Sequence, residues 1–177
     1  MQGTDEELMC AYRDGNSPAF DALYARHKGA LYRYVLRGVK GRGVAEELFQ
    51  EIWIRVVEAR HRYHPGAKFT TWLYTIAHNR LVDHWRAKEL VAAGEPDEDV
   101  SAGEAGDPAR VAEGREALAR LAAAIAGLPH AQREAFLLHE EAGLTALEIA
   151  AATGSEPEAV KSRLRYAYQK LKQALDQ

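Results

Sequence analysis

The sequence predicts an all-α protein with two small helical domains joined by a flexible acidic linker. Apolar residues recur at helical spacing through most of the chain, and no segment alternates as a β-strand does. Helix start and stop signals separate these stripes. One stretch, AAGEPDEDVSAGEAGDPAR from Ala92 to Arg110, is rich in Gly, Pro, Ala and acid. It has too few large apolar residues to offset the entropy of ordering it, and is expected to be the linker.

The first domain, residues 1–91, is expected to contain one short and three longer helices. The short helix covers Asp5 to Arg13. Ser17 followed by Pro18 predicts the start of the second helix, with Ser17 as its N-cap. Glycines at positions 38, 41 and 43 interrupt the pattern before the third stripe. The sequence His-Pro-Gly at 64–66 interrupts it again, and a last stripe runs from Phe69 to Trp85.

The second domain, residues 111–177, is expected to contain four helices. Residues 111–125 and 132–141 form two of them, and a glycine follows each. Two capping-box signals follow, Thr145 to Glu148 and Ser155 to Glu158, on either side of a tight turn at Gly154. They predict a short helix, a turn of about three residues and a longer helix over 157–175, which is the geometry of a helix-turn-helix.

The spacing inside this motif favours a DNA-binding unit over a plain helical hairpin. Ala150 allows two helices to cross closely, Gly154 can adopt a left-handed turn, and Val160 packs back between the helices. The outer face of the last helix carries Lys161, Ser162, Arg165, Tyr166, Gln169 and Lys172, and Arg163 adds to the basic cluster in the first half of the helix. A solvated helix face explains basic residues near the C-terminus of a helix, but not a basic cluster in its first half, where the helix dipole favours acids.

The charge distribution leaves room for a partner with phosphates. The formal net charge is −3. Residues 91–116 carry 8 acidic and 2 basic residues, whereas residues 1–90 carry 11 acidic and 14 basic ones. Because the acids gather in the predicted linker, the overall acidity does not exclude nucleic acid from the two domains.

Three motifs together resemble a known family. The string GLTALEIAAATGSEPEAVKSRLRYAYQKL resembles the C-terminal helix-turn-helix of bacterial RNA polymerase sigma factors of the extracytoplasmic-function (ECF) class of the sigma-70 family. AEELFQEIWIRVVEARHRY, from Ala45, looks like the polymerase-binding helix of that family. KFTTWLYTIAHNRLVDHWR, from Lys68, looks like its segment that opens and reads the minus-ten element. The motifs stand in the family's order and span almost the whole chain.

The resemblance implies a sigma factor that binds core RNA polymerase and directs promoter-specific initiation. It implies polymerase contacts, on the clamp helices of the largest subunit, at Glu47, Leu48, Gln50 and Glu51. It implies minus-ten contacts at His64, Lys68, Phe69, Trp72, Asn79, Arg80 and Arg86, and minus-thirty-five contacts at Lys161, Ser162, Arg165 and Tyr166. It also implies an anti-sigma factor as a further partner. Tyr166 and Tyr168 depart from the family, which often has basic residues there.

The chemistry of the minus-ten segment agrees with this assignment but leaves a second reading open. Aromatic faces can replace lost base stacking when a duplex opens, and cationic groups can hold the separated strand. Phe69, Trp72, Tyr74 and Trp85 are the aromatic candidates. Phe69 and Trp72 also lie at core-like spacing, and burial is the commoner role of a single aromatic residue.

The sequence supports two other classes of protein less well, a stand-alone regulator and a helical metalloenzyme. A stand-alone regulator with a sensing or dimerising N-terminal domain would share the helix-turn-helix. A helical metalloenzyme would use pairs such as His61 with His64. We expect neither catalysis, nor a cofactor, nor a metal, nor membrane insertion. The single cysteine, Cys10, cannot form an intramolecular disulfide, and the acidic N-terminus does not resemble a signal peptide, so the cytoplasm is expected.

Overall fold

The computed structural model describes residues 3–92 and 111–176. Within these ranges the elements are helical, which confirms the all-α prediction. They are α1 (Asp5–Arg13), α2 (Ser17–Gly38), α3 (Arg42–Ala59), the 3-10 turn η1 (Arg60–Arg62), α4 (Phe69–Ala92), α5 (Val111–Ala126), α6 (His130–Glu140), α7 (Ala146–Thr153) and α8 (Pro157–Leu175). Most of the predicted linker, residues 93–110, lies outside the described residues.

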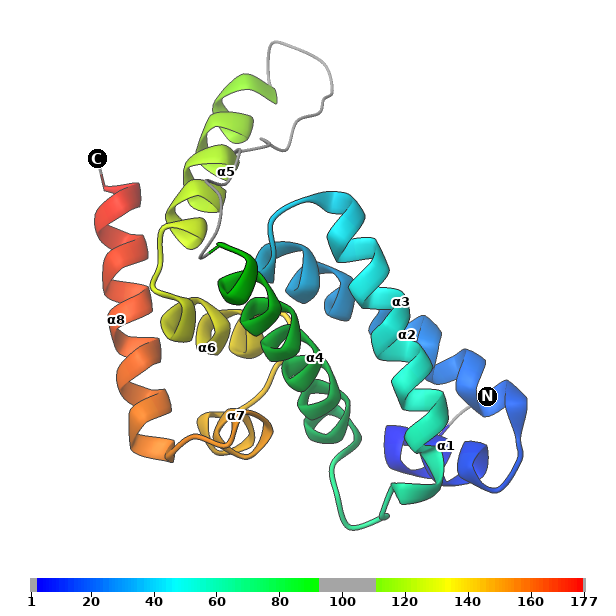
Figure 1. Ribbon diagram of the computed structural model, residues 1–177. Coiled ribbons are helices and arrows are strands. Elements are labelled where there is room, and N and C mark those ends of the chain that lie inside the picture. The colour runs from blue at the N-terminus through cyan, green and yellow to red at the C-terminus, as the bar shows by residue number, and fades with distance from the viewer. Residues whose placement is uncertain (1–2, 93–110, 177) are drawn as a thin grey trace.

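Helices α1 to α4 pack around one apolar core (Figure 1). Leucine and isoleucine side chains from α2, α3 and α4 fill it, including Leu23, Leu31, Leu48, Ile52, Leu73 and Leu81. The chain turns tightly where α2 ends against α4. A Cβ at Gly38 would lie 2.9 Å from Cδ2 of Leu81, and Trp85 Nε1 donates a hydrogen bond of 3.2 Å to the Gly38 carbonyl. Trp85 therefore anchors α4 on the end of α2.

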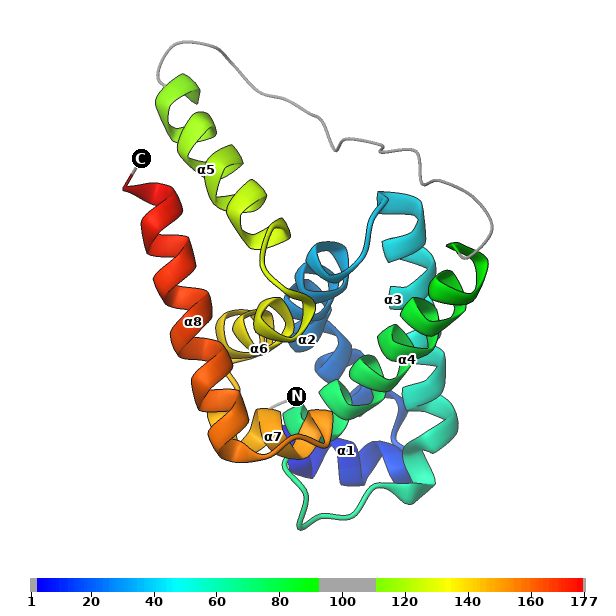
Figure 2. The ribbon, with the colours of Figure 1, turned by 60° about the vertical axis from the view of Figure 1, so that its left-hand side comes forward.

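Helices α5 to α8 form the second unit, in which α8 contacts each of the other three. Figure 2 shows α5 alongside the C-terminal half of α8, while α7 meets its N-terminal end. Gly154 adopts a left-handed backbone conformation, with φ 66° and ψ 30°, between α7 and α8. The predicted helix-turn-helix is therefore present, and α8 covers the predicted range.

Two of the predicted helix starts are wrong in detail. Asn16, not Ser17, is the N-cap of α2, so Ser17 and Pro18 both lie in the first turn. The second capping box does not form, because Glu156 is the N-cap of α8 and no side chain caps this end. The first capping box is confirmed, since Thr145 and Glu148 bond each other's backbone amides at 3.2 and 2.8 Å.

The two helical units are in contact with each other. Helix α6 packs on α2, and α7 packs on α4 (Figure 2). This contact covers part of the surface around the start of α4, where the predicted minus-ten residues begin.

Candidate nucleic-acid interface

Helix α8 has a buried face and an exposed basic face. Val160, Ala167 and Leu171 are buried, whereas Lys161, Arg165 and Tyr166 are exposed. Because the exposed residues include the first half of the helix, they are available to a DNA groove, as the N-terminal part of a recognition helix is in helix-turn-helix proteins. Ser162 is half-buried on the same side.

Three of the exposed side chains on α8 already interact with neighbours on the helix. Lys161 Nζ donates to Glu158 Oε1 at 2.6 Å, one turn earlier. The Arg165 guanidinium lies 5.1 Å from the centre of the Tyr166 ring. Both contacts lie on the exposed surface and can be exchanged for DNA at small cost. Tyr166 is therefore part of the exposed face.

Tyr168 has a different role from Tyr166. Its hydroxyl donates to Glu140, and its ring packs edge-on against Phe136 with the ring centres 5.5 Å apart. Burial, together with the Glu140 hydrogen bond, raises the pKa of Tyr168 to about 12. It is a neutral donor that joins α8 to α6.

Arg163, which lies in the same basic cluster, turns toward the motif itself. Its Nη1 donates to Ser155 Oγ at 2.9 Å, and Thr153 Oγ1 lies 3.1 Å from the same oxygen. The Ser155 hydroxyl, which was predicted to cap α8, instead receives this guanidinium. Arg163 therefore ties α8 to the turn, a role that sequence patterns did not indicate.

The predicted minus-ten residues separate into buried and exposed groups. Phe69 is fully buried, with ring neighbours that include Trp72 at 6.2 Å, so it supports the site from the core. Trp72 is half-buried and lines a pocket, whereas His64 and Lys68 are exposed. Tyr74, another aromatic candidate, is also buried, at 1% exposed. For Phe69 and Tyr74, the interpretation of the sequence pattern as core spacing is thus the correct one.

Farther along α4, Asn79 and Arg86 are exposed. Arg80 is less available, because its guanidinium pairs with Glu51 on α3. This ion pair joins a residue predicted to contact DNA to one predicted to contact polymerase. In this structure the two side chains neutralise each other's charge.

The outer face of α3 contains most of the predicted polymerase-binding residues. Glu47 and Gln50 are exposed, whereas Leu48 is only 2% exposed and belongs to the core. Ile54 lies on the same helix and is 56% exposed.

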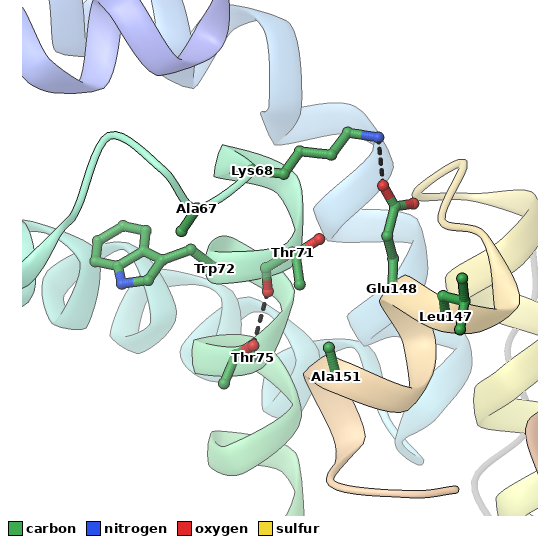
Figure 3. A pocket seen from close by; sticks show the side chains of 8 residues that line it. All are labelled: Ala67, Lys68, Thr71, Trp72, Thr75, Leu147, Glu148 and Ala151. Carbon is green, nitrogen blue, oxygen red and sulfur yellow. Dashed lines mark hydrogen bonds and ion pairs between the residues drawn. The ribbon is translucent and has the colours of Figure 1, made fainter. Parts of the chain in front are cut away.

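A pocket lies between the two units, where α4 and α7 face each other (Figure 3). Its floor includes Thr71 and Trp72 from α4, and Leu147 and Ala151 come from α7. Across its mouth Lys68 Nζ donates to Glu148 Oε1 at 2.7 Å. This hydrogen bond, with a second from the Thr145 backbone, lowers the pKa of Glu148 below its ordinary value.

Two further carboxylates of α6 and its C-cap meet the N-terminal unit. Glu134 accepts from the hydroxyl of Tyr34 at 3.2 Å and contacts His78 Nδ1. Burial and then the Glu134 charge raise the pKa of Tyr34 well above its ordinary value, so the hydroxyl stays protonated. Glu141 pairs with both Arg33 and Arg37 of α2.

The described residues contain no group of three or more His, Cys, Asp or Glu side chains that could hold a metal ion. The predicted pair His61 and His64 is exposed, and His78 faces Glu134 of the other unit. Over residues 3–92 and 111–176, no helix is long and apolar enough to cross a membrane.

Comparison with known proteins matches both units. Residues 23–90 match the family Sigma-70 region 2, and residues 118–171 match the family Sigma-70, region 4. RNA polymerase sigma factor CarQ of Myxococcus xanthus is 35% identical to this chain over 167 residues, which cover 93% of each protein. ECF RNA polymerase sigma factor RpoE of Cereibacter sphaeroides is also 35% identical, over 94% of this chain and 92% of its own length.

Solved structures agree with the fold. CnrH, determined in complex with the cytosolic domain of CnrY, superimposes with a TM-score of 0.73 at 26% identity, and 97% of each chain is covered. The sigma factor RpoE of Bartonella quintana, in complex with the anti-sigma factor NepR, also gives a TM-score of 0.73. It covers 89% of this chain and 96% of its own chain, and at 22% identity it supports the fold alone.

Proposed function

The chain belongs to the ECF class of the sigma-70 family, and we propose a division of its promoter-recognition work between the two helical units. Its function is promoter-specific initiation of transcription, with recognition of the minus-ten and minus-thirty-five elements. The proposal rests mainly on the order of the two family matches, each of which falls on one unit. We divide the chain into residues 1–91, a linker over 92–110, and residues 111–177.

We assign the minus-thirty-five element to the exposed face of α8. Lys161 and Arg165 can donate to guanine edges or phosphates, Ser162 can donate or accept, and Tyr166 offers an exposed ring. The 2.6 Å Lys161–Glu158 pair is exposed, so the lysine can leave it for DNA.

We assign the minus-ten element to the start and outer face of α4 and the loop before it. His64, Lys68, Trp72, Asn79 and Arg86 are accessible or half-buried and can contact a separated strand. Phe69 holds Trp72 in place from the core. Arg80 joins this set only if it exchanges Glu51 for DNA.

We assign core polymerase to the outer face of α3. Glu47, Gln50 and Glu51 supply polar contacts, and Leu48 fixes the helix from inside. Ile54 adds an exposed apolar side chain at the same face, which a partner could cover. The clamp helices of the largest subunit are the proposed docking partner.

Regulation by an anti-sigma factor is part of the same proposal. The solved relative CnrH is in complex with the cytosolic domain of CnrY. Sigma factors are non-catalytic initiation factors, and we infer that this chain leaves phosphodiester chemistry to the polymerase. We expect it to act in the cytoplasm because the polymerase and the promoter are there.

The test is transcription in vitro with core polymerase and a pool of random promoters. The variant Lys161→Ala/Arg165→Ala is expected to lose promoter-specific transcription, because each lost base contact costs about 1–3 kcal/mol. It should still bind core polymerase, since α3 is unchanged. A matched control, Lys170→Ala/Lys172→Ala, removes the same charge near the other end of α8 and should retain specificity.

Two outcomes would contradict the proposal. If the double variant lost polymerase binding together with transcription, α8 would be wrongly assigned. If the unaltered chain bound promoter duplex tightly alone and polymerase added nothing, the chain would be acting as a stand-alone regulator.

A further inference from the structure

Arg33 and Arg37 of α2 form a two-arginine clamp around a single carboxylate. They lie one helical turn apart, and both contact Glu141, Arg33 Nε at 2.6 Å from Oε2 and Arg37 through Nη1 to Oε1. Each arginine keeps about half of its side chain exposed, at 52% and 45%, whereas the Glu141 side chain is 9% exposed. The clamp is therefore a preformed oxyanion site on the N-terminal unit.

Glu141 is held by this clamp and not by its own helix. It is the C-cap of α6, and only its backbone amide bonds within the helix, to the carbonyl of Leu137. The negative end of the helix dipole disfavours an acid at this position. The two guanidiniums offset that cost, and the carboxylate occupies a position that suits any oxyanion of the same charge.

The same arrangement recurs along the contact between the units. Glu148 meets Lys68, and Glu134 meets Tyr34 and His78. In each case a glutamate of the C-terminal unit faces donors of the N-terminal unit. Lys68 belongs to the proposed minus-ten site. At this position the Glu148 carboxylate therefore pairs with an ammonium group that we assign to DNA binding.

A buried hydroxyl lies close to the clamp. Tyr74 is 1% exposed, and its hydroxyl has no hydrogen-bond partner among the described residues. Burial and then the Glu141 charge raise its pKa, whereas Arg33 lowers it. The ring contacts Tyr34, with centres 5.5 Å apart. Removal of α6 would thus uncover two guanidiniums with a neutral donor near them.

Simultaneous promoter recognition requires the two units to separate. The minus-ten and minus-thirty-five positions are roughly 25 base pairs apart, or about 85 Å at 3.4 Å per base pair. Units in direct contact cannot bind both. Separation withdraws Glu141 and leaves Arg33 and Arg37 without their anion, and it withdraws Glu148 from Lys68 in the same way.

We propose that Arg33 and Arg37 bind a phosphate of promoter DNA at the minus-ten element, and that Glu141 occupies this site while the two units are in contact. The proposal rests on the assignment of the minus-ten element to the N-terminal unit. Arginine pairs suit phosphate because the planar guanidinium donates two parallel hydrogen bonds. Separation of the units also frees Lys68, a residue of the proposed minus-ten site, from Glu148, and this shared release favours DNA over an acidic protein as the source of the anion.

The test uses the full-length chain assembled with core polymerase on a promoter fork with an unpaired minus-ten strand. Equilibrium binding is measured at several salt concentrations. Arg33→Gln/Arg37→Gln is expected to lower the slope of log K against log salt by about 0.7–0.9, the value for one neutralised phosphate. The matched control Arg115→Gln/Arg120→Gln removes two exposed charges from α5 and should leave the slope unchanged.

A second measurement uses the free chain and a minus-ten single strand. Glu141→Gln should raise the affinity several-fold, and it should have no effect when Arg33 and Arg37 are already glutamine. An unchanged salt slope in the double variant, or an equal effect of Glu141→Gln in both backgrounds, would overturn the proposal.

A third variant, Lys68→Gln, is measured in the same salt series. It distinguishes a failure of the arginine proposal from a failure of the proposed function. If it lowers the slope while the arginine variant does not, only the arginine site is wrong. If neither changes the slope, the assignment of the minus-ten element to this unit is wrong as well. Circular dichroism of every variant checks that the helices remain folded.

Discussion

Arg163 illustrates how a residue in a basic cluster can serve the motif without touching DNA. Its guanidinium bonds Ser155 in the turn of the helix-turn-helix, 2.9 Å away. The neighbouring Lys161 and Arg165 point outward. From spacing alone these three residues look equivalent, since all lie in the first half of one helix. The difference comes from a hydroxyl eight residues earlier in the chain.

This contact leads to a prediction for Arg163→Ala and Ser155→Ala. Each should lower the free energy of unfolding by about 1 kcal/mol, and the double variant should cost little more than either single one, because both remove the same hydrogen bond. Affinity for minus-thirty-five DNA should fall with no change in the salt slope. Urea unfolding and salt-dependent binding in the polymerase complex measure the two effects.

A direct phosphate contact would give a different pattern. Arg163→Ala would then lower the salt slope by about 0.9, and Ser155→Ala would have little effect on DNA binding. Arg165→Ala provides the comparison, since its side chain is on the exposed face.

Among the helices, local signals predicted position well and end geometry less well. Residues 5–13 and 157–175 were predicted with the bounds that the structure has. The capping box at Thr145 formed, but the one at Ser155 did not, although the two motifs look alike. At Ser155 a distant guanidinium competes for the hydroxyl, and a four-residue motif carries no information about it.

Replacement of two glycines by alanine is predicted to change the stability of the protein in opposite directions. Gly154→Ala should destabilise the protein by about 1 kcal/mol, because Gly154 has φ 66° and a Cβ is strained there. Gly43→Ala should stabilise it by about 0.5 kcal/mol, because Gly43 lies in α3 and a Cβ there meets nothing within 4 Å. Thermal unfolding of both variants is the measurement, and shifts of the same sign would contradict the assigned backbone conformations.

For the whole molecule, three glutamates of the C-terminal unit, Glu134, Glu141 and Glu148, form polar contacts with the N-terminal unit. Glu134 is almost enclosed, with 10% of its side chain exposed. It accepts from Tyr34 and contacts His78, so its removal leaves two polar groups of the N-terminal unit without a partner. Hydrogen bonds to charged groups contribute about 1.5–3 kcal/mol each.

Glu134→Gln should therefore shift the free chain toward separated units by at least about tenfold, because 1.4 kcal/mol corresponds to a factor of ten. Small-angle X-ray scattering should show a larger radius of gyration. The control Glu156→Gln removes a charge from an exposed position of the same unit and should not change the scattering. Unchanged scattering for Glu134→Gln would mean that apolar packing between the units dominates.

The sequence by itself determined the helices, the helix-turn-helix and the resemblance to sigma factors. These depend on periodicity and on motifs a few residues long, where the side chains that interact are near one another in the chain. It also identified the exposed face of α8, because a helix that buries Val160 and Ala167 must expose Lys161 and Arg165.

Only the tertiary structure decided which polar side chains are free and which already have partners. Lys68 pairs with Glu148, Arg80 with Glu51, and Arg33 with Glu141. These partners lie 80, 29 and 108 residues apart in the chain. Helical periodicity tells which side of a helix faces the core, but it does not tell which side chain from another helix will meet its polar face. That depends on how the helices and the two units pack.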